Sequence, residues 1–306
     1  MNKANDAAAK AKMLEDAMVA APVPSAWRTI WNEIYKDKIA LVALFLFVSI
    51  LIAVFVLSAI VSGTPNTQTN LLYRNLDPSP EFILGTDTGG RGIFEMLVLG
   101  ARVTFLIGFS VTILANIAGI MIGLVAGFSG GTTDNVIMRI VDTWQMLPQL
   151  MIIVVVVSML PASNVRFVFI MAAFGWLGTA RIMRAMALQQ RNLDYVSASK
   201  TLGTRNIVIM FREVLPALVP TITTNLTLLL AANMGIEVGL TFLGFGLPPG
   251  TPSLGRLISL AQSPTVLQFR MHQWLPASLL VFTMMLCIYC VGQALSRASN
   301  VRSRRS

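Results

Sequence analysis

An unbroken aliphatic run at residues 39–62, IALVALFLFVSILIAVFVLSAIVS, constrains the fold of this chain more than any other feature. The run carries no charged side chain. A helix of about 20 predominantly apolar residues crosses the hydrocarbon core of a bilayer. Backbone polar groups have no water to bond in that core, so a helix is the form in which this segment satisfies them. We therefore predict a transmembrane helix at 39–62.

Similar apolar windows account for most of the remaining sequence. The chain has 306 residues, of which 55 % are hydrophobic and only 12 % are charged, too apolar a balance for an ordinary soluble domain. Further spans are predicted at 102–127, 137–160, 166–188, 214–243 and 275–296. The sequence thus predicts an all-α integral membrane protein with about six transmembrane helices. It divides into an N-terminal tail (1–38), the first span, a turn-rich loop (63–101), a core of five spans (102–296) and a basic tail (297–306).

The basic residues predict how the chain is oriented in the membrane. Most of the 23 Lys and Arg residues fall in the N-terminal tail, around the segment between the fourth and fifth spans, and at the C-terminus. Lys and Arg near helix ends are retained on the cytoplasmic side. Both termini are therefore predicted to be cytoplasmic and the loop 63–101 extracellular. Orientation also explains the formal charge of +9, because no basic patch interleaved with aromatic residues suggests nucleic acid.

The residue types needed for metal or covalent chemistry are scarce. Cys287 and Cys290 lie three apart in the last apolar window without a second pair, and His272, predicted in an outer loop, is the only histidine. Zinc sites and histidine-based triads need more such ligands. We predict no metal, no catalytic residue and no cofactor in this chain, and assign the two cysteines to helix packing.

Within the windows, two kinds of residue are candidates for special roles. Gly119, Gly123 and Gly127 recur every four residues and form a strip that lets another helix approach, either in this chain or in a second subunit. Asp142 and Glu237 are ionisable groups inside predicted spans and so are functional candidates by default. The alternative is that a neighbouring helix or an arginine satisfies them, with Arg139 as the candidate partner of Asp142.

The most informative segment lies between the fourth and fifth spans, at residues 192–216. It predicts a short helix, a glycine break at Gly203 and a second helix. Tyr195, Ala198 and Leu202 follow helical spacing and form an apolar face too short to span a membrane. Such a face requires a partner. The candidate contact residues are Asp194, Tyr195, Ser197, Ala198, Ser199, Leu202, Gly203, Leu215 and Pro216.

This segment resembles the cytoplasmic signature of binding-protein-dependent ABC importer permeases, Glu-Ala-Ala, three residues, Gly, nine residues, Ile-x-Leu-Pro. Residues 197–199 occupy the first three positions, Gly203 the glycine, and Leu215 and Pro216 the final pair. The chain departs from the signature at Ser197 for glutamate, Ser199 for alanine and Glu213 for isoleucine. Segments 84–91, 100–102, 138–142, 241–246 and 252–255 narrow the resemblance to C-type permeases of the oligopeptide, dipeptide and nickel family.

The resemblance implies a type I importer permease fold in a bacterial cell membrane, with residues 192–206 as a coupling helix that docks on an ATPase. It implies four partner subunits: a second homologous permease, two ATPases that hold ATP and magnesium, and an extracellular peptide-binding protein. The substrate would be a peptide or, in the alternative, nickel. A stand-alone transporter driven by an ion gradient and a membrane-embedded enzyme are the remaining alternatives, weakened by the lack of midplane ionisable residues and of catalytic groups.

Two further segments have competing interpretations. Residues 85–92, GTDTGGRG, imitate a phosphate-binding loop but follow no predicted strand and fall on the outer side, so we predict a tight turn with Asp87 paired to Arg91. Residues 7–21 have helix-forming composition. They fit either a helix on the membrane surface or a solvated tail.

Overall fold

The computed structural model describes residues 37–303, with side chains as far as Arg297. The predicted N-terminal tail helix and most of the basic C-terminal tail lie outside the residues so described. Within the described range every regular element is a helix, and the only pairing of extended backbone is an isolated bridge between Thr86 and Gly92. The predicted all-α class is confirmed.

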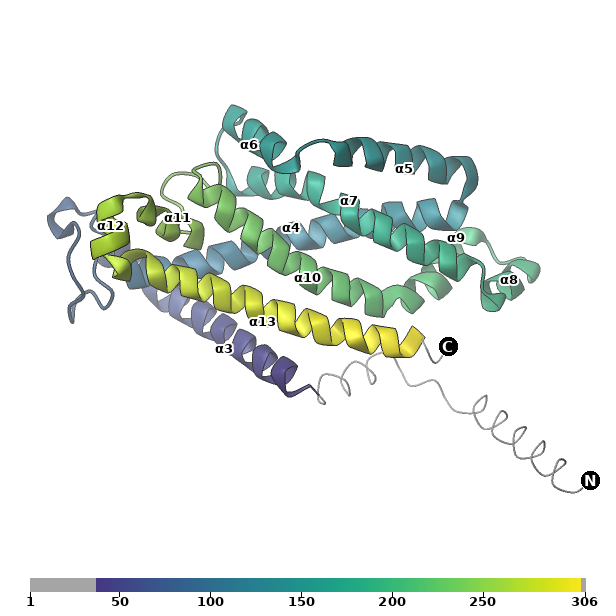
Figure 1. The fold of residues 1–306 in the computed structure, drawn as a ribbon, viewed down its shortest axis with the longest axis horizontal. Helices are drawn as coiled ribbons and strands as arrows, with labels where there is room; N and C mark the ends of the chain where they lie inside the picture. Colours follow the sequence, from purple (N-terminus) through teal and green to yellow (C-terminus); the bar gives the residue numbers. More distant parts are fainter. Residues whose placement is uncertain (1–36, 304–306) are drawn as a thin grey trace, which may run out of the picture.

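Long helices run side by side along the molecule, and short helices gather at its two ends (Figure 1). One end carries α8 and α9, and the other carries the loop 62–92 with α11 and α12. The α-helices are α3 (Lys38–Val61), α4 (Ile93–Ser129), α5 (Gly131–Met146), α6 (Gln149–Met159), α7 (Asn164–Arg191), α8 (Asp194–Thr201), α9 (Asn206–Ile209), α10 (Leu215–Phe242), α11 (Leu254–Ser259), α12 (Pro264–Phe269) and α13 (Met271–Ser303). Short 3₁₀ turns cover Pro65–Thr67, Leu71–Tyr73 and Leu260–Gln262, and a π-helical turn, Met210–Val214, joins α9 to α10.

Five helices in the described residues are long and apolar enough to cross a membrane, and a sixth span results if α5 and α6 are counted together. Those two helices are bent by 78° at a short break, so the third span predicted at 137–160 is divided at Pro148 and begins at Gly131. Leu147 is extended and precedes Pro148, whose ring disfavours helical backbone in the preceding residue. Proline therefore splits this span, although its hydropathy is continuous enough to predict one helix.

Two other boundaries differ from the prediction. The second span begins at Ile93 rather than 102, so the loop predicted to reach residue 101 ends at Gly92, the N-cap of α4. The fifth span extends back to Asn206 through α9 and the π-helical turn. His272, predicted in a loop, lies in the first turn of α13. Glu95 interrupts the apolar sequence near the start of the second span, and Arg212 and Glu213 interrupt it in the fifth, so the windows chosen from hydropathy begin too late.

Helix α4 packs directly on α7 along the glycine strip. A Cβ atom added to Gly119 would lie 2.5 Å from the Cβ of Thr179, and one on Gly123 would lie 2.3 Å from the carbonyl oxygen of Ala180. At Gly127 the corresponding distance to the carbonyl oxygen of Arg184 is 2.4 Å. These distances leave no room for a side chain. Of the two predicted partners for the strip, the structure places a helix of the same chain against it.

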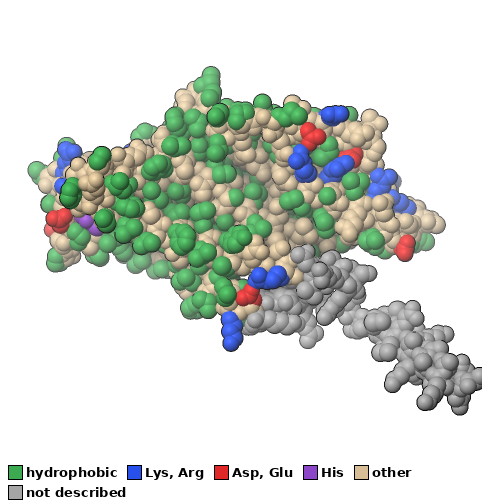
Figure 2. Space-filling model, viewed as in Figure 1, with side chains coloured by type: hydrophobic (Ala, Val, Ile, Leu, Met, Phe, Trp, Pro, Cys, Tyr) green, Lys and Arg blue, Asp and Glu red, His purple; other side chains and the backbone are tan. Residues whose placement is uncertain are grey.

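The apolar surface between the two ends is extensive. Figure 2 shows hydrophobic side chains spread over the middle of the molecule, with most charged groups toward its left and right ends and a smaller group at its lower edge. On α3, Phe45 is 76 % exposed and Ile52 60 % exposed, although both are strongly apolar. Surfaces of this kind suit lipid rather than water. The fold therefore has the exterior of a multi-pass membrane protein.

Replacing Gly123 by alanine tests the importance of the close α4–α7 contact. We expect Gly123→Ala to destabilise the protein by about 1–3 kcal/mol, because the added methyl group forces the two backbones apart. Thermal unfolding in mild detergent measures the change. Gly178→Ala is the matched control, because Gly178 lies on α7 with nothing within 4 Å of an added Cβ. Equal unfolding temperatures for the two variants would contradict the packing role.

Candidate functional site

Helix α8 is attached to the bundle by one fully buried side chain, Val196. It packs in a cluster to which α4 contributes Leu124 and Phe128, and α7 contributes Met183 and Ala187. Met210, Val214 and Leu218, from the π-helical turn and α10, complete the cluster. Val196 thus inserts at the point where the ends of three membrane-spanning helices meet.

The other side of α8 is uncovered. The predicted apolar face lies on this outer surface, where Tyr195 is 38 % exposed and Leu202 85 % exposed, and Ala198 is also exposed. Asp194 and Ser197 are exposed beside them. The sequence analysis missed two apolar residues that border this surface, Leu193 (42 % exposed) and Ile207 (60 % exposed). The face was chosen by helical spacing within α8, whereas Leu193 lies in the loop before α8 and Ile207 lies in α9.

Tyr195 differs from the rest of this surface because its ring is partly sheltered. Its hydroxyl donates a hydrogen bond to Oε1 of Gln190 at 2.8 Å, which ties α8 back to the end of α7. Partial burial raises the pKa of the Tyr195 phenol above its ordinary value, and the nearby Glu213 carboxylate raises it further. The phenol is therefore neutral at physiological pH and acts only as a hydrogen-bonding group.

Gly203 ends α8 in a left-handed turn, with φ +79°. Its N–H donates to the carbonyl of Lys200 at 3.0 Å, and the N–H of Thr204 donates to the carbonyl of Ser199 at 3.1 Å. These two bonds form the Schellman motif, in which glycine is favoured because it tolerates positive φ. Nothing lies within 4 Å of an added Cβ. The turn itself therefore explains this glycine, since no other part of the described chain approaches it.

The last signature pair, Leu215 and Pro216, begins α10 directly after the π-helical turn. Helical backbone continues into α10 from the π-helical turn, so Pro216, which has no N–H, leaves a gap in the hydrogen-bond ladder at this point. Glu213, within that turn, is bonded to α8: the single hydroxyl proton of Ser199 is shared between its two carboxylate oxygens, which lie 2.8 and 2.9 Å from Oγ. The residues of the predicted signature are thus brought together at one end of the bundle, on α8 and at the start of α10.

Asp142 has a different partner from the one predicted. Its Oδ1 accepts from Nη2 of Arg181 at 2.6 Å, whereas Arg139 forms no ion pair with it. The correction follows from packing, because α5 lies along α7 and presents Asp142 to that helix. Both side chains are about half exposed, at 46 % for Asp142 and 52 % for Arg181. This geometry favours the structural interpretation of Asp142.

A stronger pair on the same two helices was missed. Nε and Nη2 of Arg184 donate to the two carboxylate oxygens of Asp134 at 2.5 and 2.6 Å, and Asp134 is only 6 % exposed. This bidentate geometry is characteristic of strong arginine–carboxylate pairs. Asp134 precedes the predicted third span, so the search for ionisable groups within the spans did not include it.

Glu237 is completely buried in α10. Thr241 donates to its Oε1 at 3.0 Å, and the hydroxyl groups of Thr104 and Ser253 are also close to the carboxyl. Thr104 in turn accepts from the backbone N–H of Leu254 at 3.3 Å. The carboxyl group therefore lies among hydroxyl groups that link α10 to α4 and α11, without an ion pair to any described cation.

Buried amides link three spans in the membrane interior. Nδ2 of Asn225 donates to Oδ1 of Asn116 at 3.0 Å and to Oγ1 of Thr179 at 2.9 Å, joining α10 to α4 and α7. Nδ2 of Asn233 donates to Oγ1 of Thr112 at 2.9 Å. Uncharged polar groups of this kind hold helices together in lipid. A search for ionisable residues passes over them, although asparagine within an apolar window is itself a signal.

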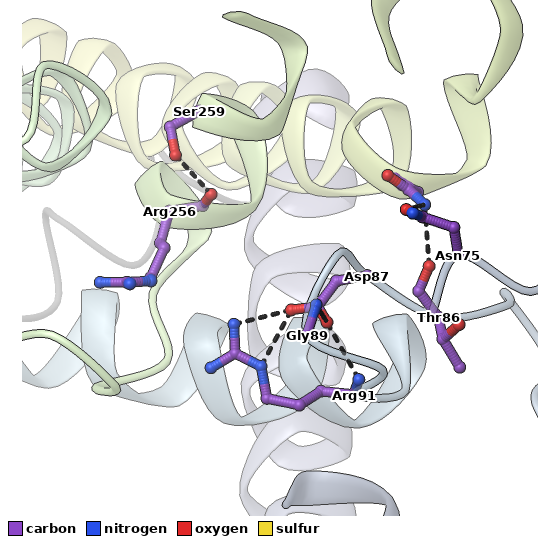
Figure 3. A network of polar contacts seen from close by, with 8 residues as sticks. Asn75, Thr86, Asp87, Gly89, Arg91, Arg256 and Ser259 are labelled. Atoms are coloured by element: carbon purple, nitrogen blue, oxygen red, sulfur yellow. Dashed lines mark hydrogen bonds and ion pairs between the residues drawn. The ribbon is translucent and has the colours of Figure 1, made fainter. Parts of the chain in front are cut away.

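The end opposite α8 is built around the segment 85–92. Asp87 accepts from Nε and Nη2 of Arg91 at 2.9 and 2.7 Å and from the backbone N–H of Gly89 at 2.7 Å, so the predicted pair is confirmed (Figure 3). Gln273 of α13, fully buried, donates to the carbonyl of Thr86 at 2.8 Å. The loop is thus fastened to the bundle.

A cavity of about 310 Å³ opens beside this loop, between it and α11. Arg91 and Arg256 both line it, and their guanidinium groups extend in the same direction in Figure 3. Arg256 makes no side-chain hydrogen bond within the described residues, where its backbone bonds to Ser253 and Ser259.

The predicted scarcity of metal-binding residues concerns the two cysteines and the histidine. The described residues contain no group of three metal-binding side chains. Cys287 is buried in α13 and Cys290 is partly buried.

Comparison with known proteins identifies the family. Residues 119–304 match the family described as the binding-protein-dependent transport system inner membrane component. The chain belongs to this family. Residues 25–78 also match the N-terminal transmembrane domain of oligopeptide transport permease C. The family predicted from the signature is thus confirmed, and the chain is a multi-pass membrane permease of a binding-protein-dependent transport system.

Several relatives of this inner membrane component match over nearly their whole length. The chain is 38 % identical to the oligopeptide transport system permease protein OppC of Lactococcus lactis, over 90 % of this chain and 94 % of that protein. Identity to OppC of Bacillus subtilis is 32 %, over 85 % of each chain. Identity to the dipeptide transport system permease protein DppC of Bacillus subtilis is 31 %, over 96 % of this chain and 91 % of that protein.

The two ion pairs between α5 and α7 give a direct comparison of buried and exposed charge. We expect Asp134→Asn to lower the free energy of unfolding by about 2–3 kcal/mol, because Arg184 loses a bidentate partner in a largely buried site. Asp142→Asn should cost less than about 1 kcal/mol, since that pair is open to screening. Thermal unfolding of both variants in the same detergent tests this order. A larger loss for Asp142→Asn would contradict the burial argument.

Proposed function

We propose that this chain is the noncatalytic permease subunit of an ATP-binding-cassette importer of peptides. The observation that carries the proposal is the uncovered apolar surface of α8, attached from behind to three membrane-spanning helices by Val196. The partner proposed for it is one of two ATPase subunits, which hold ATP and magnesium. A second homologous permease and an extracellular peptide-binding protein complete the assembly. The names of the relatives, which are oligopeptide and dipeptide permeases, support a peptide substrate.

The proposed orientation places α8 in the cytoplasm. Lys200, Arg205 and Arg212 surround the α8 segment, and basic residues near helix ends are retained on the cytoplasmic side. Both termini would then be cytoplasmic, because α3 begins and α13 ends toward the same end of the bundle (Figure 1). The opposite end, with the loop 62–92 and the cavity beside Arg256, would face the peptide-binding protein.

The mechanism proposed for this subunit is mechanical. Closure of the ATPase dimer moves α8, and α8 moves the ends of α4, α7 and α10, with which Val196 is packed. Such a rigid-body shift changes the populations of inward-facing and outward-facing states only if the ATPase contacts differ between them. Within this account the chain supplies the contact and the moving helices, and the chemistry of ATP hydrolysis belongs to its partners.

The proposed docking surface is tested by placing a charge on it. We expect Leu202→Asp to reduce copurification of the ATPase by at least about tenfold, because an exposed apolar residue central to an interface contributes on the order of 1–2 kcal/mol or more. The amount of ATPase retained per permease on an affinity column in mild detergent measures the effect. Leu202 is 85 % exposed, so the permease itself should fold normally.

Leu72→Asp provides the matched control. Leu72 is 88 % exposed but lies in the loop at the opposite end of the molecule, where no ATPase contact is proposed. That variant should retain the ATPase at the level of the unaltered protein. Equal retention by Leu202→Asp and the unaltered protein would argue against α8 as the docking site.

A further inference from the structure

Ser199 and Glu213 depart from the permease signature together, and the structure shows them in contact. The signature has alanine and isoleucine at these positions, which cannot form a hydrogen bond, whereas here Ser199 Oγ donates to both oxygens of the Glu213 carboxylate at 2.8 and 2.9 Å. Both residues are partly buried. No described lysine or arginine forms an ion pair with Glu213. Ser199 is therefore the principal partner of this carboxylate in the described chain.

The contact spans the most deformable part of the backbone between α8 and α10. Two irregular features lie along that path, the left-handed turn at Gly203 and the π-helical turn Met210–Val214. Single π-helical turns are rare and frequently occur at functional sites. After the turn, Pro216 offers no N–H to the helical hydrogen-bond ladder. The backbone alone therefore connects α8 to α10 only flexibly. The bond between the Ser199 and Glu213 side chains, 14 residues apart in sequence, adds a second connection between the two helices.

The attachments of α8 restrain different movements. Tyr195 bonds to Gln190 at the end of α7, and Lys200 lies over the Phe128 ring of α4. The bond from Ser199 to Glu213 is the polar side-chain attachment directed at the start of α10. Val196 fixes the position of α8 by packing among apolar side chains, a contact without directional preference. A hydrogen bond to a carboxylate is directional and stronger than one between neutral groups. The pair therefore fixes the rotation of α8 relative to the start of α10, which packing around a single valine leaves less constrained.

We propose that Ser199 and Glu213 are positioning residues that hold α8 in the orientation in which its movement is passed to α10. This inference rests on the proposed function, in which α8 is the contact for the ATPase. In this protein a hydrogen-bonded pair then does what a small and an apolar residue do in the signature. Each residue contributes to this positioning only when the other is present, because the contribution is the hydrogen bond between them.

The test is a double-substitution cycle on the assembled transporter. The variants are Ser199→Ala, Glu213→Ile and the double variant Ser199→Ala/Glu213→Ile, which restores the signature residues. Each is reconstituted in vesicles with its partner permease, ATPases and binding protein. The readout is uptake of labelled peptides from a casein digest, divided by ATP hydrolysed in the same vesicles. Thr283→Val is the control, because Thr283 lies on α13, away from α8, and its hydroxyl bonds to the carbonyl of Leu279 in its own helix.

We expect each single variant to lower peptide uptake per ATP by about three- to tenfold, since it leaves a partly buried polar group without its partner. The double variant should recover most of that loss, because removing both partners of a hydrogen bond is far less costly than removing one. Glu213→Gln retains an acceptor for the Ser199 hydroxyl and should stay within about twofold of the unaltered protein. Thr283→Val should leave the ratio unchanged.

Two results would overturn the inference. Unchanged coupling in both single variants would show that the contact is dispensable, and a double variant as impaired as the product of the singles would show that the residues act independently. ATPase copurification on the same samples separates this inference from the proposed function. Normal ATPase retention with unchanged coupling refutes only the positioning role, whereas a permease that never retains ATPase refutes the docking role of α8 itself.

Discussion

The close contact between α4 and α7 is the interaction on which the rest of this structure depends. In lipid no hydrophobic force drives helices together, so association relies on van der Waals contact and polar bonds between backbones that approach closely. Glycines at 119, 123 and 127 permit that approach. The pocket that receives Val196 is built from the ends of these same two helices, and the amide of Asn225 reaches both of them from α10. The packing of α8 against the bundle therefore depends on the close approach of α4 and α7 that the glycine strip permits.

Polar groups are distributed according to their cost in the membrane. In the interior of the bundle most are amides and hydroxyls, such as Asn116, Asn225 and Thr179, which bond to one another. The buried carboxyl of Glu237 lies among hydroxyl groups. Charged pairs lie nearer the ends, where Asp134 in the first turn of α5 meets Arg184 and Asp87 in the loop before α4 meets Arg91. Ionisable groups are expensive at the bilayer centre, whereas amides bonded across helices cost much less. The long helices are therefore bonded to one another inside the bundle, and the exposed surfaces proposed to bind partner proteins lie at its two ends.

Much of this arrangement is predictable from sequence because hydropathy and local turn chemistry are properties of short segments. The span at 39–62, the turn at Gly203 and the Asp87–Arg91 pair are all of this kind. Partners chosen by tertiary packing are not, so Arg181 was missed as the partner of Asp142, and Asp134 was missed altogether. In the contact between Ser199 and Glu213, the glutamate lies within the π-helical turn, which no sequence period reveals. The break at Pro148 is predictable from sequence, because proline disfavours helical backbone in the residue before it, although hydropathy alone continues across the break.

The central claim is that the outer surface of α8 is held by an ATPase in the intact membrane. Photo-cross-linking from a benzoylphenylalanine placed at Ala198 tests this most directly, because Ala198 is exposed beside the proposed interface while Val196, two residues away, is fully buried. The account predicts a covalent product between the permease and a nucleotide-hydrolysing subunit in native membranes. Consistent failure of Ala198 to capture such a subunit, in an assembly that still transports peptide, would contradict it.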